Sequence, residues 1–142
     1  MKRTILLLTG LALFGGRAVQ AQGYTIVVNA SNPVASLSKA QTADLFMKRT
    51  GKWPSGKPAV PVDQAKNAPV RAAFSQAVLG RPVTQISAHW QQQIFSGADV
   101  PPTERSGDAA VMAFVASTPG GVGYVTAGTA PLAGVKAVTV TP

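Results

Sequence analysis

Strand-like and helix-like segments alternate along this chain of 142 residues, and no other feature of the sequence constrains its fold as strongly. Residues 24–29 (YTIVVN) are mostly β-branched and lead into a turn at Ser31-Asn32-Pro33, which is typical of a strand that ends in a loop. Three further segments have the same character and predict strands at 59–62, 122–126 and 135–140. We expect the last of these to form an exposed edge of the sheet.

Four helices are expected between these strands, because capping residues precede apolar residues at helical spacing. Ser38 and Gln41 form a Ser-x-x-Gln capping box for the first helix. Asn67 and Thr84 are the expected caps of the next two, and the fourth should begin near Ser106 after a loop over residues 97–106. The order β-α-β-α-α-α-β-β predicts one three-layer α/β domain with a mixed, mostly parallel sheet.

The first 21 residues have the pattern of a secretory signal peptide. Lys2 and Arg3 precede an apolar stretch over 5–14, and small residues lead to a predicted cleavage site after Ala21. An uncleaved membrane anchor is the alternative, but the apolar stretch is shorter than the roughly 20 residues that span a bilayer. We therefore expect export to the periplasm and a single folded domain over residues 22–142.

The net charge favours small anions as partners. The full chain carries +8, and removal of Lys2, Arg3 and Arg17 with the signal peptide lowers the charge to +5. Several basic residues lie together around Trp53, a pattern that can mark nucleic-acid binding. An exported protein rarely meets nucleic acid, so we interpret this cluster as a solvated basic turn that attracts anions weakly.

The sequence argues against an enzyme and against a bound cofactor. It has no cysteine, which excludes disulfides, thiolate catalysis and cysteine-based metal sites. Its single histidine, His89, has no acidic residue near it in the sequence to orient it as a general base. The five acidic residues show no spacing typical of paired catalytic carboxylates or of a metal site.

Two loops that lead from a strand into a helix are the candidate binding sites. In open α/β sheets, ligands lie at the carboxyl ends of strands, where helix N-termini present backbone N–H groups. The first loop offers Ser31 and Asn32. The second offers the ligand-binding candidates Gln64, Lys66, Asn67 and Arg71. In the alternative interpretation, Asn67 only caps its helix while Lys66 and Arg71 are solvated.

The ordered motifs IVVN, LF, Trp-Pro-x-Gly and TPGGVGYV resemble one lobe of the periplasmic phosphate-binding proteins of ABC transporters, which have the type II solute-binding fold. The resemblance extends from Tyr24 to about Ala127, and Pro119–Val125 (PGGVGYV) is its most specific part. It implies a non-enzymatic, solute-binding-like module that binds phosphate or another small anion.

Two features depart from that family. Its members close two lobes around the ligand, and this chain is long enough for one. Asp63 also stands where the family has an Arg, and Asn67-Ala68-Pro69 replaces its Ser-Gly-Thr. These departures support an alternative function, a periplasmic protein–protein interaction module that has lost its ligand site and either self-associates or binds a partner protein through the uncovered face.

Overall fold

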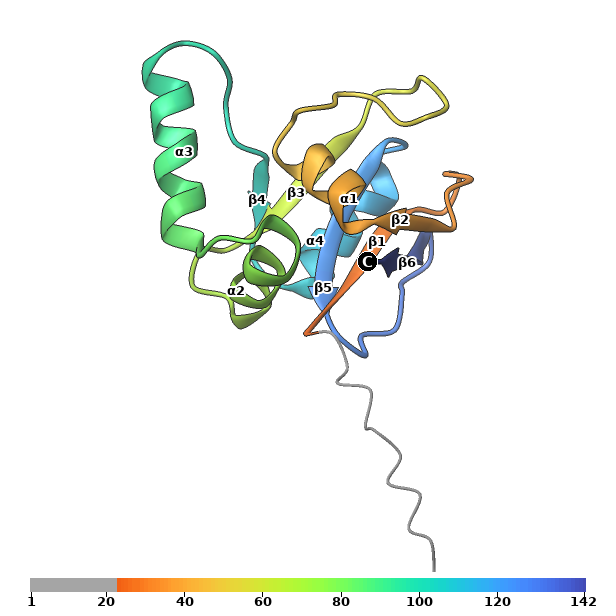
Figure 1. The fold of residues 1–142 in the computed structure, drawn as a ribbon. Helices are drawn as coiled ribbons and strands as arrows, with labels where there is room; N and C mark the ends of the chain where they lie inside the picture. The colour runs from red at the N-terminus through yellow and green to blue at the C-terminus, as the bar shows by residue number, and fades with distance from the viewer. Residues whose placement is uncertain (1–22) are drawn as a thin grey trace, which may run out of the picture.

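A computed structural model describes residues 23–142, which form a six-stranded sheet between two layers of helices (Figure 1). The strands are β1 (Tyr24–Asn29), β2 (Ser36–Ser38), β3 (Val60–Gln64), β4 (Thr103–Arg105), β5 (Gly121–Thr126) and β6 (Val135–Thr141). The α-helices are α1 (Lys39–Phe46), α2 (Pro69–Phe74), α3 (Val83–Phe95) and α4 (Asp108–Ser117), and the π-helical turn η1 (Ser75–Leu79) continues α2.

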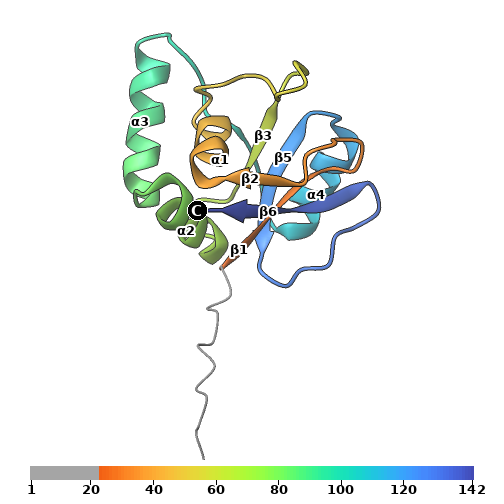
Figure 2. The same cartoon turned by 45° about the vertical axis from the view of Figure 1, so that its right-hand side comes forward.

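The sheet has the strand order β2-β6-β1-β5-β3-β4. Strand β1 is antiparallel to both of its neighbours, β5 and β6, whereas the other three pairings are parallel. This mixed, mostly parallel sheet confirms the predicted fold class. The turned view in Figure 2 brings β2 and β6 to the front. Strand β6 lies between β2 and β1, so the expectation that residues 135–140 form a sheet edge was wrong.

Each face of the sheet has its own hydrophobic core. Helix α4 packs through Val111 and Val115 against Val27 and Val62 on one face. The opposite face packs against α1, α2 and η1, and its centre is a group of aromatic rings in which Phe74 stacks on Tyr124 with a centroid separation of 4.0 Å. Helix α3 stands at the side of the molecule next to β4, where it contacts η1 (Figure 1).

Local signals determine the start of α1 and the end of η1. The Ser38 side chain accepts a hydrogen bond from the Gln41 backbone N–H at 3.1 Å, and the Gln41 side chain accepts one from the Ser38 N–H at 2.9 Å. Both bonds of the predicted capping box are therefore present. The π-helical turn ends at Gly80, which has the left-handed conformation that glycine adopts without steric cost.

Several predicted boundaries were wrong. Ala68, not Asn67, is the N-cap of α2, and it makes no side-chain capping bond because alanine has no acceptor. Thr84 lies inside α3, which begins directly after Pro82. The expected loop at 97–106 contains the three-residue strand β4, and β2 was also missed. Strands this short carry too little sequence pattern to be recognised without their neighbours in the sheet.

The predicted signal peptide and its cleavage after Ala21 lie outside the described residues. Within residues 23–142, the longest helix is α3, and no helix combines the length and the hydropathy that a membrane crossing requires.

Candidate functional site

The two loops predicted to bind ligand lie at opposite ends of the sheet. Strand β1 is antiparallel to β5, and β5 is parallel to β3, so β1 and β3 run in opposite directions. Ser31 and Asn32 follow the carboxyl end of β1, while the loop from Gln64 to Arg71 follows the carboxyl end of β3. The structure therefore cannot bring the two sets of residues to one ligand.

Ser31 and Asn32 use their side chains to build their own turn. The Ser31 hydroxyl donates to Asn29 Oδ1 at 2.7 Å, and Asn32 Oδ1 accepts from the Val34 N–H at 3.0 Å. Both residues line a small cavity of about 80 Å³, together with Lys57 on its rim. A cavity of this size holds a few water molecules and is well below the volume of a typical ligand pocket.

The richer polar cluster lies at the other end of the sheet, which we call the carboxyl edge. Strands β3, β4 and β5 end here at Gln64, Arg105 and Thr126, because the three strands run in the same direction. Helices α2 and α4 both begin at this edge, at Pro69 and Asp108. This is the position at which open α/β sheets bind their ligands.

Arg71 is the charged centre of the carboxyl edge. Its guanidinium donates to the Gln64 carbonyl at 2.7 Å and lies 3.2 Å from both Asp63 and Glu104. The Arg71 and Asp63 side chains are 6% and 11% exposed, so this ion pair is buried, whereas Glu104 is 44% exposed. Arg71 is therefore neutralised from inside by a buried carboxylate and from outside by an exposed one.

Asp63 is also bound by the hydroxyl of Tyr124, which donates to its Oδ1. Burial raises the pKa of the Asp63 carboxyl, and the opposing effect of the Arg71 charge does not fully offset it. Burial and the neighbouring Asp63 carboxylate raise the pKa of Tyr124 as well, so its hydroxyl remains a hydrogen-bond donor at any physiological pH.

Gln64 connects this ion pair to the start of α4. Its amide donates to Asp108 Oδ1 at 2.8 Å and to the Tyr124 carbonyl at 3.2 Å. Asp108 also accepts from the Thr126 N–H at 3.0 Å. Partial burial acts to raise the pKa of Asp108, but its hydrogen bonds, above all those from Thr126, outweigh burial and hold the pKa below its usual range.

Lys66 and Asn67 are the solvent-facing members of the cluster. Both are exposed in the β3–α2 loop, and over residues 23–142 neither side chain makes a hydrogen bond or an ion pair. A cavity of about 520 Å³ opens nearby between the starts of α2 and α4, with Gln64, Pro69, Asp108 and Thr126 in its wall. Its volume lies within the range of small-molecule pockets.

Sequence reasoning found four residues of the carboxyl edge (Gln64, Lys66, Asn67 and Arg71) and missed their partners. Asp63 was considered only as a departure from the family pattern, although it forms the buried pair with Arg71. Glu104 and Tyr124 lie far from Arg71 in the sequence, and no motif connects them. The position of Asp108 at a helix start was the one signal that could have placed it here.

The described residues offer no metal site, since no group of three or more His, Cys, Asp or Glu side chains lies close enough together to hold a metal ion. The acidic side chains of the carboxyl edge are instead engaged by Arg71, Tyr124 and Gln64.

No protein-family model and no curated protein matches the sequence. Solved structures match the fold. A protein of Clostridium perfringens, assigned as a phosphate ABC transporter substrate-binding protein and solved with bound phosphate, superposes with a TM-score of 0.65 at 20% identity over 83% of this chain. An ABC-type phosphate transport receptor of Vibrio cholerae superposes with a TM-score of 0.60 at 19% sequence identity over 83% of this chain. PstS of Borrelia burgdorferi superposes with a TM-score of 0.64 at 11% identity over 84% of this chain.

This chain covers 44%, 46% and 47% of those three proteins, which is less than half of each. It therefore has the α/β fold of one lobe of a type II periplasmic binding protein. The predicted resemblance to the phosphate-binding proteins of ABC transporters is confirmed for the fold.

Proposed function

We propose that this chain is an exported, non-enzymatic solute-binding-like module that binds a small anion at the carboxyl edge, with phosphate as the first ligand to test. The fold supports a solute-binding role. The observation that carries the anion proposal is Arg71, a guanidinium at the carboxyl edge whose outer partner, Glu104, is exposed enough to be displaced. An anion that replaces Glu104 would keep Arg71 neutralised, so the exchange avoids leaving a buried charge unpaired.

Lys66 and Asn67 are the residues proposed to meet the anion first. Their side chains are exposed and carry an ammonium and an amide donor, which are suitable partners for phosphate oxygens. Ser31 and Asn32 are not part of this site, because they lie at the opposite end of the sheet. One lobe leaves the ligand open to water on its far side, so we expect a dissociation constant of about 1 mM.

Isothermal titration calorimetry with phosphate and with sulfate tests this proposal. The double variant Lys66→Ala/Asn67→Ala should weaken phosphate binding, while Glu104→Gln should strengthen it because the internal competitor for Arg71 loses its charge. Lys57→Ala is the matched control, since Lys57 is also an exposed lysine but lies at the other end of the sheet. Saturable binding that none of the carboxyl-edge variants changes would place the anion elsewhere, and no binding by the wild type would refute the proposal.

A second candidate function is self-association, and one observation favours it. Phe95 is 96% exposed at the end of α3, and Ile94 and Val100, which lie within five residues of it in the sequence, are also exposed. A cluster of large apolar side chains in water is typical of an interaction surface. Light scattering should then show a mass that rises with concentration in the wild type and stays monomeric in Phe95→Ser. A monomer at every concentration, together with no partner captured from periplasm, would leave solute binding as the function.

A further inference from the structure

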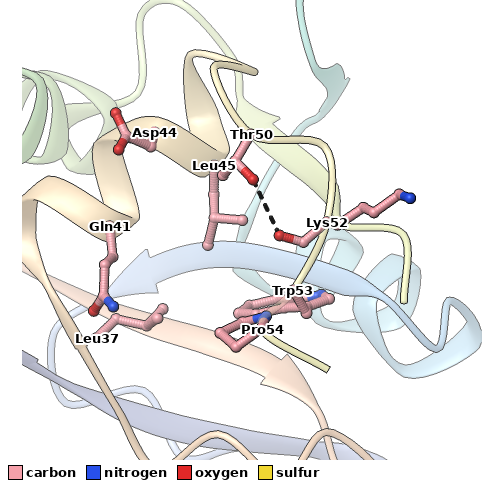
Figure 3. A pocket seen from close by; sticks show the side chains of 8 residues that line it. All are labelled: Leu37, Gln41, Asp44, Leu45, Thr50, Lys52, Trp53 and Pro54. Carbon is pink, nitrogen blue, oxygen red and sulfur yellow. Dashed lines mark hydrogen bonds between the residues drawn. The ribbon is translucent and has the colours of Figure 1, made fainter. Parts of the chain in front are cut away.

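A third cavity lies on the α1 side of the sheet, away from the carboxyl edge. It has a volume of about 310 Å³ and lies between α1 and the turn at residues 50–54 (Figure 3). Trp53 in its wall donates from Nε1 to the Gly120 carbonyl at 3.0 Å. Gly120 directly precedes β5, whereas the carboxyl edge holds the other end of that strand. This cavity and the one at the carboxyl edge are therefore separate sites.

The inner wall of this cavity is apolar and rigid. Leu37, Leu45 and Trp53 are all buried side chains of the main hydrophobic core. Figure 3 shows Leu45 pointing from α1 toward Trp53 and Pro54, with Leu37 on the opposite side of the cavity. Because the indole is fixed by its hydrogen bond to Gly120, these groups form a preformed apolar surface.

The rim of the cavity offers two donors, and its one carboxylate already has a counter-ion. Gln41 uses its carbonyl oxygen for the Ser38 N–H, so its NH₂ group is the part left for a ligand. Asp44 is the acidic residue of the rim, and Arg49 neutralises it through an ion pair of 2.7 Å. Lys52 is exposed, and Figure 3 shows its side chain directed away from Leu45 and Trp53. Over residues 23–142 its ammonium makes no ion pair.

We infer that this cavity is a binding site for a small amphipathic carboxylate. The apolar body of the ligand would lie against Leu45, Trp53 and Pro54, and its carboxylate would face the Gln41 amide and the Lys52 ammonium. Lys52 reaches it by a change of rotamer, which is rapid for an exposed side chain. The donor-rich rim explains why a carboxylate binds better than a neutral molecule of the same shape.

The cavity volume limits the size of this ligand. At about 310 Å³ it lies at the lower end of the range for small-molecule pockets, which suits a single aromatic ring or a short aliphatic chain. Inorganic phosphate has no apolar body, so it gains nothing from the Trp53 wall. The site therefore differs from the carboxyl edge in ligand class as well as in position.

The test uses phenylacetate as the probe, with its neutral analogue phenylacetamide and inorganic phosphate as comparisons. The sequence has two tryptophans, so Trp90→Phe leaves Trp53 as the reporting fluorophore. Phenylacetate should change the Trp53 emission saturably, with a dissociation constant of about 1 mM. Phosphate should neither change that emission nor displace phenylacetate.

Two rim variants separate charge recognition from folding. Gln41→Glu retains the capping box, because Glu serves at this position as well as Gln, but it places a carboxylate at the rim. It should weaken phenylacetate binding by about fivefold or more, since a like charge then faces the ligand. Lys52→Ala should weaken phenylacetate binding by about two- to fivefold, because an exposed ion pair contributes a free energy of this size. Lys57→Ala, which changes a lysine five residues further along the chain and outside this cavity, should have no effect.

Phenylacetamide has no charge, so its binding should be the same in wild type, in the two rim variants and in Lys57→Ala. The inference is overturned if wild type shows no saturable change with phenylacetate, or if the acid and the amide respond alike to both rim variants. It is also overturned if phenylacetate binding is lost in Lys66→Ala/Asn67→Ala, because the ligand would then occupy the carboxyl edge. If phosphate does not bind at the carboxyl edge, the proposed function fails, but carboxylate binding in the cavity beside α1 is not affected.

Discussion

Replacing Arg71 with methionine should destabilise the protein strongly, because the buried carboxylate of Asp63 would lose its counter-ion. Methionine fills a similar volume, so the variant removes the charge with little loss of packing. Asp63 is 11% exposed and pairs with Arg71 at 3.2 Å. After the substitution it would retain only the Tyr124 hydroxyl and the Gln64 N–H as partners.

Breaking a buried ion pair from one side costs about 3–5 kcal/mol. The two remaining hydrogen bonds to Asp63 place the expected cost of Arg71→Met near the lower end, at about 3 kcal/mol. For a domain of this size that corresponds to a fall in Tm of roughly 10 °C. The double variant Asp63→Asn/Arg71→Met should regain most of the loss, because neither partner is then charged.

Lowering the pH should reduce the loss of unfolding free energy that Arg71→Met causes. Burial already raises the pKa of Asp63 above its usual value of 3.8, and loss of the Arg71 charge raises it further. The folded state then binds a proton more tightly than the unfolded state, so stability falls as pH rises from the unfolded to the folded pKa. The cost should be full near about pH 7 and smallest near about pH 4.

Urea denaturation followed by circular dichroism at both pH values measures these free energies of unfolding. Wild type and Asp63→Asn serve as references at each pH, so that general effects of acid are subtracted. A cost of less than about 1 kcal/mol near neutral pH would show that the pair contributes no more than a surface salt bridge. A cost that acid leaves unchanged would show that Asp63 is not the source of the instability.

Variants at three further positions test other parts of the structure. Gly123→Ala should destabilise by about 1–3 kcal/mol, since its new methyl group would lie 2.7 Å from Val111 Cγ1, and an unchanged urea midpoint would contradict the close packing of α4 on β5. Ser38→Ala should cost about 1 kcal/mol through loss of the α1 cap, whereas Ser38→Thr should cost less. Asp108 has a lowered pKa, so it contributes stability that is present above its unfolded pKa and lost as pH falls through its folded pKa. In Asp108→Asn, the free energy of unfolding should therefore fall less steeply below about pH 4 than it does in wild type. The same fall in both proteins would contradict this prediction.

The sequence by itself determined the elements whose signals are local. The capping box of Ser38 and Gln41 satisfies backbone groups within one helical turn, and the β-branched residues of 24–29 favour a strand through their own side-chain shape. The glycines before and within β5, which belong to the motif that carries the family resemblance, are also required by local sterics. A Cβ at Gly120 would lie 1.9 Å from the Pro58 carbonyl oxygen, so the backbones approach too closely for any other residue.

The tertiary structure decided which residues of the candidate site can act together. The directions of β1 and β3 are set by their shared neighbour β5, which lies far from both in the sequence, and those directions separate Ser31 and Asn32 from the carboxyl edge. The same pairing places Tyr124 of β5 beside Asp63 at the end of β3. Such contacts depend on strand order, and strand order is fixed by burial on both faces of the sheet at once, which no local stretch of sequence encodes.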